Sequence, residues 1–341
     1  MIFENLLKKI EYVEYKKQNN IELQNITNNS KNVKYDDIFV AVAGNLSDGH
    51  KYIKDAIANG AKTIVYQNDI NFEDGINYIK VSDSRKALSD ISNILEDYPS
   101  KKMTVIGVTG TNGKTTTATT IYYLMKEIYD SATNIGTDGT FIGDKRADNS
   151  NTTPDIYLLN KIFNESLDNG IDKVVLEASS HGLYQNRLKG IDFDYGIFTN
   201  LSTEHLDYHK TMDNYFDAKM ILLENSKNKL VNIDDPYGKN AKERFIDAIS
   251  FGLDENADYR AIDIKKNETT TDFKLKGVDF TINSIADYEI YNKLAAIATL
   301  NLMGASLEEI SSKLKEFKGI PSRFQYVEND LGKNIIIDFA H

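Results

Sequence analysis

The sequence predicts an α/β protein with a small N-terminal α/β domain and a central domain built on a doubly wound, mostly parallel sheet. Apolar runs typical of buried strands alternate with segments of helical spacing along most of the chain. That alternation is the pattern of a parallel sheet covered by helices on both faces. In addition, a glycine-rich turn joins one strand directly to a helix. The length of 341 residues suits two or three domains.

Composition excludes several classes of protein. With 40 Lys and Arg against 51 Asp and Glu, the net charge of −11 argues against a protein that wraps nucleic acid. Cysteine is absent, which excludes disulfides, thiolate metal sites and cysteine nucleophiles. No apolar run approaches the roughly 18–20 residues of a membrane helix, and the N-terminus lacks the apolar stretch of a secretory signal. We therefore expect a cytoplasmic monomer with no nucleic-acid partner and no membrane span.

The first 99 residues are expected to form the N-terminal domain. Its predicted strands lie at 37–43, 63–66 and 78–81, and its predicted helices at 51–57 and around 88–95. Gly60 follows the first of these helices and can adopt the left-handed conformation that ends helices. The turn-forming residues Tyr98-Pro99-Ser100 mark a linker to the next domain.

Residues 100–330 are expected to form the central domain. Its predicted strands lie at 102–108, 173–177, 195–200 and 230–233. Thr153-Pro154-Asp155 predicts a helix start, with a threonine cap, proline at the first helical position and an acid in the first turn. Ligands of doubly wound sheets bind at the carboxyl ends of the strands, and the polar motifs of this domain directly follow predicted strands.

The glycine-rich turn has the composition of a phosphate-binding loop. Glycines let backbone N–H groups converge on phosphate oxygens, and the helix N-terminus adds its dipole. Lys114 would neutralise the β- and γ-phosphates, and the Thr115 hydroxyl would reach Mg²⁺. The strict G-x-x-x-x-G-K-[ST] pattern fails only at Val108. The predicted nucleotide contacts are Gly110, Thr111, Asn112, Gly113, Lys114, Thr115 and Thr116.

This loop, Thr-Gly-Thr-Asn-Gly-Lys-Thr-Thr, resembles that of the Mur ligases, which use ATP to join amino acids to a peptidoglycan precursor. Other segments resemble the branch of that family that adds the third residue of the stem peptide to UDP-N-acetylmuramoyl-L-Ala-D-Glu. Those segments are Asn151–Pro154, Glu177–Leu183, Phe198–His209 and Tyr215–Lys219. The resemblance covers nearly the whole chain. It implies a UDP-substrate-binding N-terminal domain and an ATP-binding central domain.

The resemblance further implies two Mg²⁺ sites and a modified lysine. Glu177 would complete one site with Thr115, because Mg²⁺ prefers oxygen ligands. By resemblance, His205 binds a second ion, and CO₂ carbamylates Lys219 to give an anion able to hold that ion. From sequence alone Lys219 would be one more exposed lysine. Carbamylation requires the neutral amine of this side chain, so a lowered pKa of Lys219 would favour the modification. His205 and His209 at i,i+4 could suggest zinc, but the glutamate of HExxH is missing. His209 is expected to be structural.

Substrate and further nucleotide contacts also follow from the resemblance. Arg187 suits a carboxylate of the dipeptide through paired N–H donors. Ser30 would contact the uridine portion. The residues expected around the UDP-muramoyl dipeptide are Ser30, Thr152, Thr153, Ser179, Gln185 and Arg187. Those expected around ATP are Asn292 at adenine, Arg323 at the phosphates, Asp338 at the ribose and His341 near the nucleotide. Glu289 stands where relatives commonly have Asn.

The implied reaction is ordered ligation through an acyl phosphate. The D-Glu carboxylate attacks the γ-phosphate of ATP, and the amine of the third amino acid then displaces phosphate. Lys114, Lys219 and His205 are the expected catalytic residues, since cations and metal ions stabilise charge on the transferred phosphoryl group. The third amino acid stays open among L-lysine, meso-diaminopimelate and related diamines.

Two alternatives stay open at this stage. One is another ATP-dependent ligase, of the folylpolyglutamate or cyanophycin synthetase type. The other is a two-domain piece that binds ligands without ligating them, because residues 331–341 resemble only the first strand of a third domain. An acyl-transfer site lacking one wall would neither exclude water nor position the amine, so we expect substrate binding with poor ligation.

Overall fold

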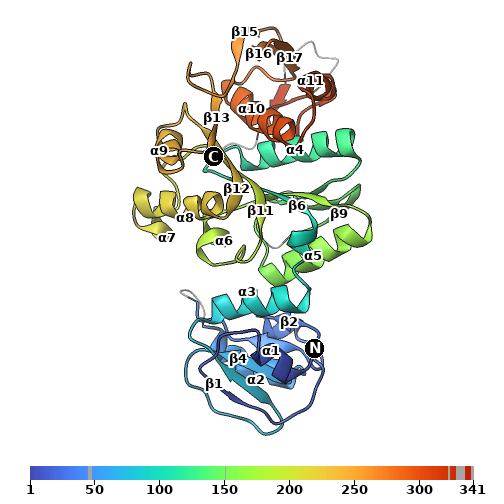
Figure 1. Ribbon diagram of the computed structural model, residues 1–341, viewed down its shortest axis with the longest axis vertical. Helices are drawn as coiled ribbons and strands as arrows, with labels where there is room; N and C mark the ends of the chain where they lie inside the picture. The colour runs from blue at the N-terminus through green and yellow to red at the C-terminus, as the bar shows by residue number, and fades with distance from the viewer. Residues whose placement is uncertain (45–47, 150, 322, 328–334, 339–341) are drawn as a thin grey trace. The chain divides into compact units, whose positions relative to one another are not determined.

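The computed structural model describes residues 1–44, 48–149, 151–321, 323–327 and 335–338. The chain divides into two compact units (Figure 1). Unit 1 consists of Met1–Lys102, Pro154–Glu165 and Gly182–Ile191, and unit 2 contains the remainder. The predicted linker lies close to the first break, but nothing in the sequence indicates that two later segments belong to unit 1.

Unit 1 is built on a five-stranded sheet in the order β1-β5-β4-β3-β2. Its strands are β1 Glu14–Lys16, β2 Ile26–Thr27, β3 Ile38–Val40, β4 Thr63–Tyr66 and β5 Asn77–Lys80. The last four run parallel, and β1 pairs antiparallel with β5. The fully buried side chains of Phe39, Ile64 and Tyr78 form the centre of its core. The helices are α1 Phe3–Leu7, α2 Ile53–Ala58 and α3 Ser84–Leu95.

The expected elements of this unit are confirmed with shifted ends. Strand β4 matches the prediction, whereas β3 is shorter than the expected 37–43. The helix expected at 51–57 begins as a 3₁₀ turn, Gly49–Tyr52, before α2. Gly60 follows α2 with a φ of +114°, as expected for a residue that ends a helix.

Unit 2 is built on a nine-stranded sheet in the order β14-β13-β12-β11-β6-β10-β7-β8-β9. Its strands are β6 Thr104–Thr109, β7 Thr133–Gly136, β8 Gly139–Ile142, β9 Lys145–Ala147, β10 Lys173–Glu177, β11 Phe193–Phe198, β12 Ser226–Asn232, β13 Ile249–Gly252 and β14 Tyr259–Arg260. In this spatial order, all strands from β14 through β7 run parallel. Strands β8 and β9 add an antiparallel edge. Because β10 and β11 lie on opposite sides of β6, the carboxyl end of β6 is where such sheets bind ligands.

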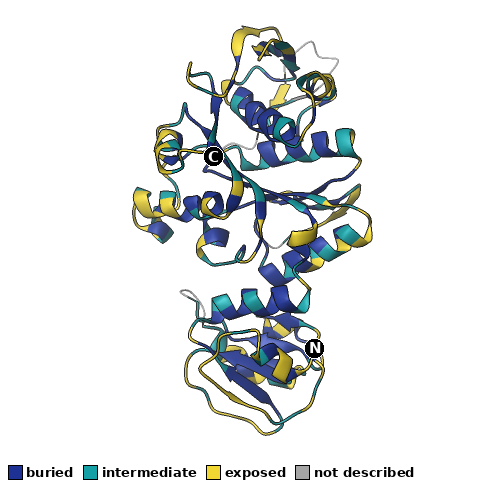
Figure 2. Cartoon of the chain, in the orientation of Figure 1, coloured by how far each residue is buried: buried dark blue, intermediate teal, exposed yellow. Residues whose placement is uncertain are grey.

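Helices cover both faces of this sheet, and Figure 2 shows their buried inner sides. The helices of unit 2 are α4 Lys114–Tyr129, α7 Leu206–His209, α8 Met212–Glu224, α9 Pro236–Arg244, α10 Asp287–Leu302 and α11 Leu307–Glu316, and the short helix α6 Ser180–Tyr184 begins in unit 2 and ends in unit 1. Ile121 of α4 and Leu294 of α10 belong to the core on one face. Met220 of α8 and Ala241 of α9 belong to the core on the other. The predicted doubly wound sheet is confirmed.

Three features of the chain differ from the sequence-based expectation. An antiparallel sheet, β15 Ile262–Lys266, β16 Thr271–Leu275 and β17 Val278–Ile282, was not predicted, nor was the pair β18 Gln325–Val327 and β19 Ile335–Ile337. The predicted helix start at Thr153-Pro154 is wrong by two residues. Helix α5, Ile156–Asp168, begins later, and the Asp155 carbonyl accepts the Leu159 N–H. The Thr153 hydroxyl instead donates to the Glu177 carbonyl at 2.8 Å, which ties it to β10.

Within the part of the chain that the structure describes, every helix is too short or too polar to cross a lipid bilayer.

Packing of α8 against β6 predicts the effect of one small substitution. A Cβ added at Gly107 would lie 2.5 Å from Leu222 Cδ1 and 2.9 Å from Phe193 Cε1. We expect Gly107→Ala to lower the free energy of unfolding by about 1–3 kcal/mol, the usual cost of overpacking. Urea denaturation of Gly107→Ala, Leu222→Ala and the double variant measures this. The double variant should lose less than the two single losses combined, and strict additivity would contradict the clash.

Candidate functional site

The phosphate loop connects β6 to α4 and requires glycine at two positions. Gly110 has a φ of +152° and Gly113 a φ of +84°, backbone conformations that favour glycine. A Cβ at Gly110 would collide with Thr199 Oγ1, and one at Gly113 with Asn292 Oδ1. The loop therefore packs directly against the end of β11 on one side and against α10 on the other.

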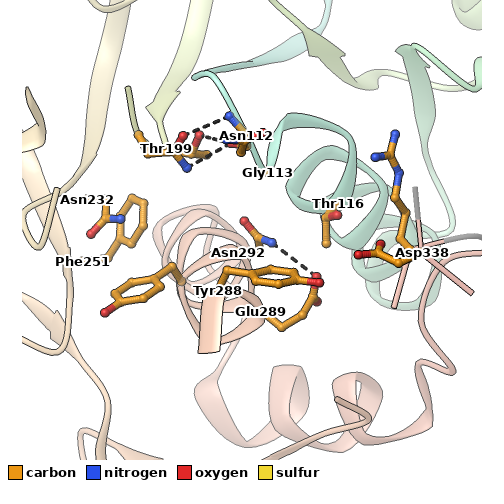
Figure 3. A pocket seen from close by; sticks show the side chains of 13 residues that line it. Asn112, Gly113, Thr116, Thr199, Asn232, Phe251, Tyr288, Glu289, Asn292 and Asp338 are labelled. Carbon is orange, nitrogen blue, oxygen red and sulfur yellow. Dashed lines mark hydrogen bonds between the residues drawn. The ribbon is translucent and has the colours of Figure 1, made fainter. Parts of the chain in front are cut away.

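The residues that follow β11 hold the loop by hydrogen bonds (Figure 3). The N–H groups of Thr111 and Asn112 donate to the carbonyl and side-chain oxygens of Asn200, each at 2.9 Å. The Thr199 hydroxyl donates to the Asn112 carbonyl at 2.6 Å. Sequence reasoning did not single out Thr199 or Asn200, although both lie in a segment that resembles the Mur ligases.

Two lysines converge on one carbonyl of the loop. Lys114 Nζ donates to the carbonyls of Gly110 at 2.9 Å and Thr111 at 2.8 Å. Lys219 Nζ donates to the same Gly110 carbonyl at 2.7 Å and lies 4.5 Å from the centre of the Tyr215 ring. Burial, assisted by the charge of Lys114, holds the pKa of Lys219 well below its usual range. With 1% of its surface exposed, Lys219 is not the surface lysine that the sequence alone would suggest.

A buried carboxylate lies beside the first turn of α4. Glu177, at the end of β10, is 2% exposed and accepts the Thr115 hydroxyl at 3.0 Å. The N–H and hydroxyl of Thr137 donate to it at 2.8 and 3.2 Å. Burial raises the pKa of Glu177, while these hydrogen bonds and Lys114 act in the opposite direction. The hydroxyl and carboxylate oxygens that meet here are the donor types that Mg²⁺ prefers, so these residues fit the ion. Thr137 was not predicted.

Three histidines gather next to Lys219. The ring of His181 lies 5.0 Å from that of His205 and 5.5 Å from that of His209, centre to centre. His205 lies 6.0 Å from the Tyr215 ring, so His205 and Lys219 flank the same aromatic side chain. No group of three or more His, Asp or Glu side chains among the described residues has the arrangement of a metal site. The second metal position therefore remains a prediction from resemblance.

His209 has a structural role in this arrangement, as expected. It is buried, its Nε2 lies 3.0 Å from Ser180 Oγ, and its ring stacks on Tyr215. Burial, together with the charges of His181, Lys219 and His205, lowers the pKa of His209 to about 4. The side chain therefore stays neutral in the folded protein at ordinary pH.

A cavity of about 450 Å³ opens beside the phosphate loop (Figure 3). It is lined by Asn112, Gly113, Thr116, Thr199, Asn200, Asn232, Phe251, Tyr288, Glu289, Tyr291, Asn292, Arg323 and Asp338. Asn292, Arg323 and Asp338 are thus brought together with the loop. Sequence reasoning missed the aromatic residues of the lining, because isolated aromatics in separate elements carry no local signal. The predicted contact His341 lies outside the described residues.

The predicted substrate residues divide between the two units. In unit 2, Thr153 Oγ1 lies 2.9 Å from Ser179 Oγ, and Thr152 Oγ1 lies 3.1 Å from Thr137 Oγ1. Since Thr137 and Thr153 both contact Glu177, these hydroxyls surround the end of β10.

In unit 1, Gln185 and Arg187 line a small cavity together with Arg85. Arg187 donates to Gln185 Oε1 at 2.9 Å, and its Nε lies 3.4 Å from Asp155 Oδ1. Arg85 was not singled out in the sequence. Ser30 begins a 3₁₀ turn and is buried, and it is not among the described residues that line this cavity.

The fold and the loop define a phosphate-loop protein on a doubly wound sheet. The chain matches the family model "Mur ligase middle domain" over residues 108–300 and the model "Mur ligase family, catalytic domain" over residues 22–95. The chain belongs to the Mur ligase family.

Named relatives of similar sequence support this membership. The chain is 39% identical to the UDP-N-acetylmuramoyl-L-alanyl-D-glutamate–2,6-diaminopimelate ligase of Clostridium perfringens, over 100% of this chain and 72% of that protein. It is 38% identical to the ligase of the same name from Fusobacterium nucleatum, over 96% of this chain and 70% of that protein. A solved structure of a ligase of that name matches with a TM-score of 0.78 at 26% identity, over 90% of this chain. The chain spans 65% of that solved chain.

The lowered pKa of His209 predicts a pH-dependent loss of stability. The unfolded chain binds a proton at this side chain near pH 6.5, whereas the folded chain binds it only near pH 4. Stability should therefore fall as pH drops through this window, by about 2 kcal/mol between pH 7.5 and 5 from this group. Urea denaturation at both pH values measures the loss. His209→Gln should show a pH dependence smaller by that amount, and an unchanged dependence would contradict the assignment.

Proposed function

We propose that the chain acts in the ATP-dependent addition of 2,6-diaminopimelate to UDP-N-acetylmuramoyl-L-alanyl-D-glutamate, a step of peptidoglycan synthesis. The observation that carries this proposal is the identity of 39% to a ligase of that name over the full length of this chain. The phosphate loop, with Glu177 and Lys219 beside it, supports the proposal chemically. The amine is proposed to be 2,6-diaminopimelate because the similar ligases act on it. The cytoplasmic setting and the monomeric state remain predictions.

Mur ligases use ATP and Mg²⁺, and the residues at the end of β6 fit both. Backbone N–H groups of the loop and the N-terminus of α4 would receive phosphate oxygens. Thr115 and Glu177 would hold Mg²⁺, which supplies charge neutralisation on the phosphates. The aromatic and amide side chains of the cavity beside the loop, such as Tyr291 and Asn292, would surround the base.

The proposed reaction converts a carboxylate into a reactive acyl group. An oxygen of the D-Glu carboxylate attacks the γ-phosphorus of ATP, the bond to the bridging oxygen breaks, and ADP leaves. The amine nitrogen then attacks the acyl carbon, phosphate leaves with the bonding pair, and the nitrogen loses a proton. Lys114 belongs to the loop that would contact the transferred phosphoryl group, where a cation stabilises the developing charge. No protein nucleophile is needed, in keeping with a chain that has no cysteine.

Lys219 is proposed to react with CO₂. Its lowered pKa favours the neutral amine, whose lone pair forms an N–C bond to CO₂ with release of one proton. The product is an anion next to His205, and together these two groups would supply the ligands of the second metal position. In the unmodified state, the ammonium or amine of Lys219 instead donates to Gly110.

Substrate binding and turnover test the proposed function directly. Titration calorimetry with UDP-N-acetylmuramoyl-L-Ala-D-Glu should show saturable binding, and UDP-N-acetylglucosamine should bind more weakly because it lacks the dipeptide carboxylates. Arg187→Ala should weaken binding of the first ligand about tenfold and leave that of the second within about twofold.

ADP release is then measured with L-lysine and with meso-diaminopimelate. ATP hydrolysis that is independent of the muramoyl dipeptide would contradict the proposal.

Carbamylation of Lys219 has its own spectroscopic test. Protein equilibrated with ¹³C-bicarbonate should show a carbamate ¹³C resonance that disappears in Lys219→Met. Lys227→Met is the matched control, since Lys227 is an exposed lysine and should leave the resonance unchanged. A resonance that persists in Lys219→Met, or that is lost equally in the control, would contradict the assignment.

A further inference from the structure

A buried ion pair on α10 lies at the edge of the nucleotide cavity. Lys293 Nζ lies 2.8 Å from Glu289 Oε2, one helical turn away, and the two side chains are 5% and 7% exposed. Removing two charges from water is costly, and a buried pair is often no more stabilising than apolar side chains of the same size. Its presence here is therefore better explained by what the two charges do to their neighbours.

The second oxygen of Glu289 holds the amide of Asn292. Asn292 Nδ2 donates to Glu289 Oε1 at 3.3 Å, as drawn in Figure 3. The amide oxygen of Asn292 consequently faces the other way, where it accepts the Thr117 hydroxyl at 3.4 Å and packs against Gly113. Glu289 thus determines which end of the amide faces the phosphate loop.

Lys293 connects the pair to the helix that follows the loop. Its Nζ donates to Thr120 Oγ1 at 3.1 Å, and the Thr120 hydroxyl donates to the Thr116 carbonyl at 2.8 Å. Thr116 lines the nucleotide cavity. Helix α10 is therefore joined to the first turns of α4 by two side-chain contacts. These are Asn292 to Thr117 and Lys293 to Thr120.

The charge of Glu289 matters because the expected ligand is a polyanion. Glu289 lines the same cavity as Gly113 and Thr116. An uncompensated carboxylate in this low-dielectric position would repel the phosphates, whereas Lys293 cancels that charge locally. A neutral side chain at this position would need no such partner.

We propose that Glu289 and Lys293 form one positioning unit for the nucleotide. Glu289 orients the Asn292 amide against the phosphate loop, and Lys293 compensates the Glu289 charge in the cavity that would bind the anionic nucleotide. This inference rests on the nucleotide site of the proposed function. It predicts that loss of Lys293 alone weakens nucleotide binding, whereas loss of the Glu289 charge alone does not, although the two losses reduce stability similarly.

The test is the affinity of the 341-residue chain for ADP with Mg²⁺, measured by titration calorimetry. Lys293→Met leaves the carboxylate unpaired and should weaken ADP binding about tenfold. Glu289→Gln keeps the acceptor for Asn292 and leaves a positive charge, so affinity should stay within about threefold of the unchanged chain. The double variant Glu289→Gln with Lys293→Met is neutral and should also return to within about threefold.

Thermal unfolding without nucleotide separates these effects from folding. Both single variants leave one buried charge unpaired and should lose comparable stability. Equal weakening of ADP binding in both, or failure of the double variant to restore it, would overturn the inference while leaving the nucleotide site intact. Absence of ADP binding by the unchanged chain would overturn both.

If Lys293→Met does not fold, a second uncharged double variant still tests the proposal. Glu289→Ala with Lys293→Met removes the acceptor for Asn292 without creating a charge. It should bind ADP about fivefold more weakly than Glu289→Gln with Lys293→Met, because the amide is no longer oriented. Equal affinities of these two double variants would overturn the positioning role of Glu289.

Discussion

The close approach of the phosphate loop to the end of β11 is the constraint on which the site depends. Gly110 leaves no room for a side chain beside Thr199, and the N–H of Asn112 is already held by Asn200. The parallel register of β11, β6 and β10 brings their carboxyl ends to one edge of the sheet. The loop is therefore held against the end of β11, where Thr199 and Asn200 contact it directly.

Buried ionisable side chains lie around this edge of the sheet, and their environment determines the chemistry that is possible there. Glu177 and Lys219 are both almost completely buried, and the shifts of their pKa values both favour the neutral form through desolvation. Each has hydrogen-bond partners that fix its position rather than a direct partner of opposite charge among the contacts described above. Side chains of this kind can interact with a charged group that binds or forms beside them, such as ATP with Mg²⁺ or a carbamate. On the opposite side of the loop, Glu289 and Lys293 neutralise one another within α10.

Sequence patterns predicted this architecture where local signals were strong. Strands Thr63–Tyr66 and Lys173–Glu177 occur where the apolar runs placed them, because short runs of buried residues have few other interpretations. The helix start at Thr153 was misplaced because its hydroxyl has a tertiary partner, the Glu177 carbonyl, that competes with capping. The sheet β15–β17 was missed although its sequence carries a strand signal. Apolar and polar residues alternate along Val278–Ile282, and Gly277 precedes that strand in a turn.

By itself, the sequence determined the doubly wound fold, the phosphate loop and the membership in a family, since each depends on residue types at short, regular spacings. Only the tertiary structure decided the environment of single side chains. It showed Lys219 buried against Gly110 rather than exposed, Thr137 bound to Glu177, and the Glu289–Lys293 pair of α10 buried. The physical reason is that burial and pairing depend on which distant segments the sheet brings together. Residues far apart along the chain leave no periodic trace of such contacts.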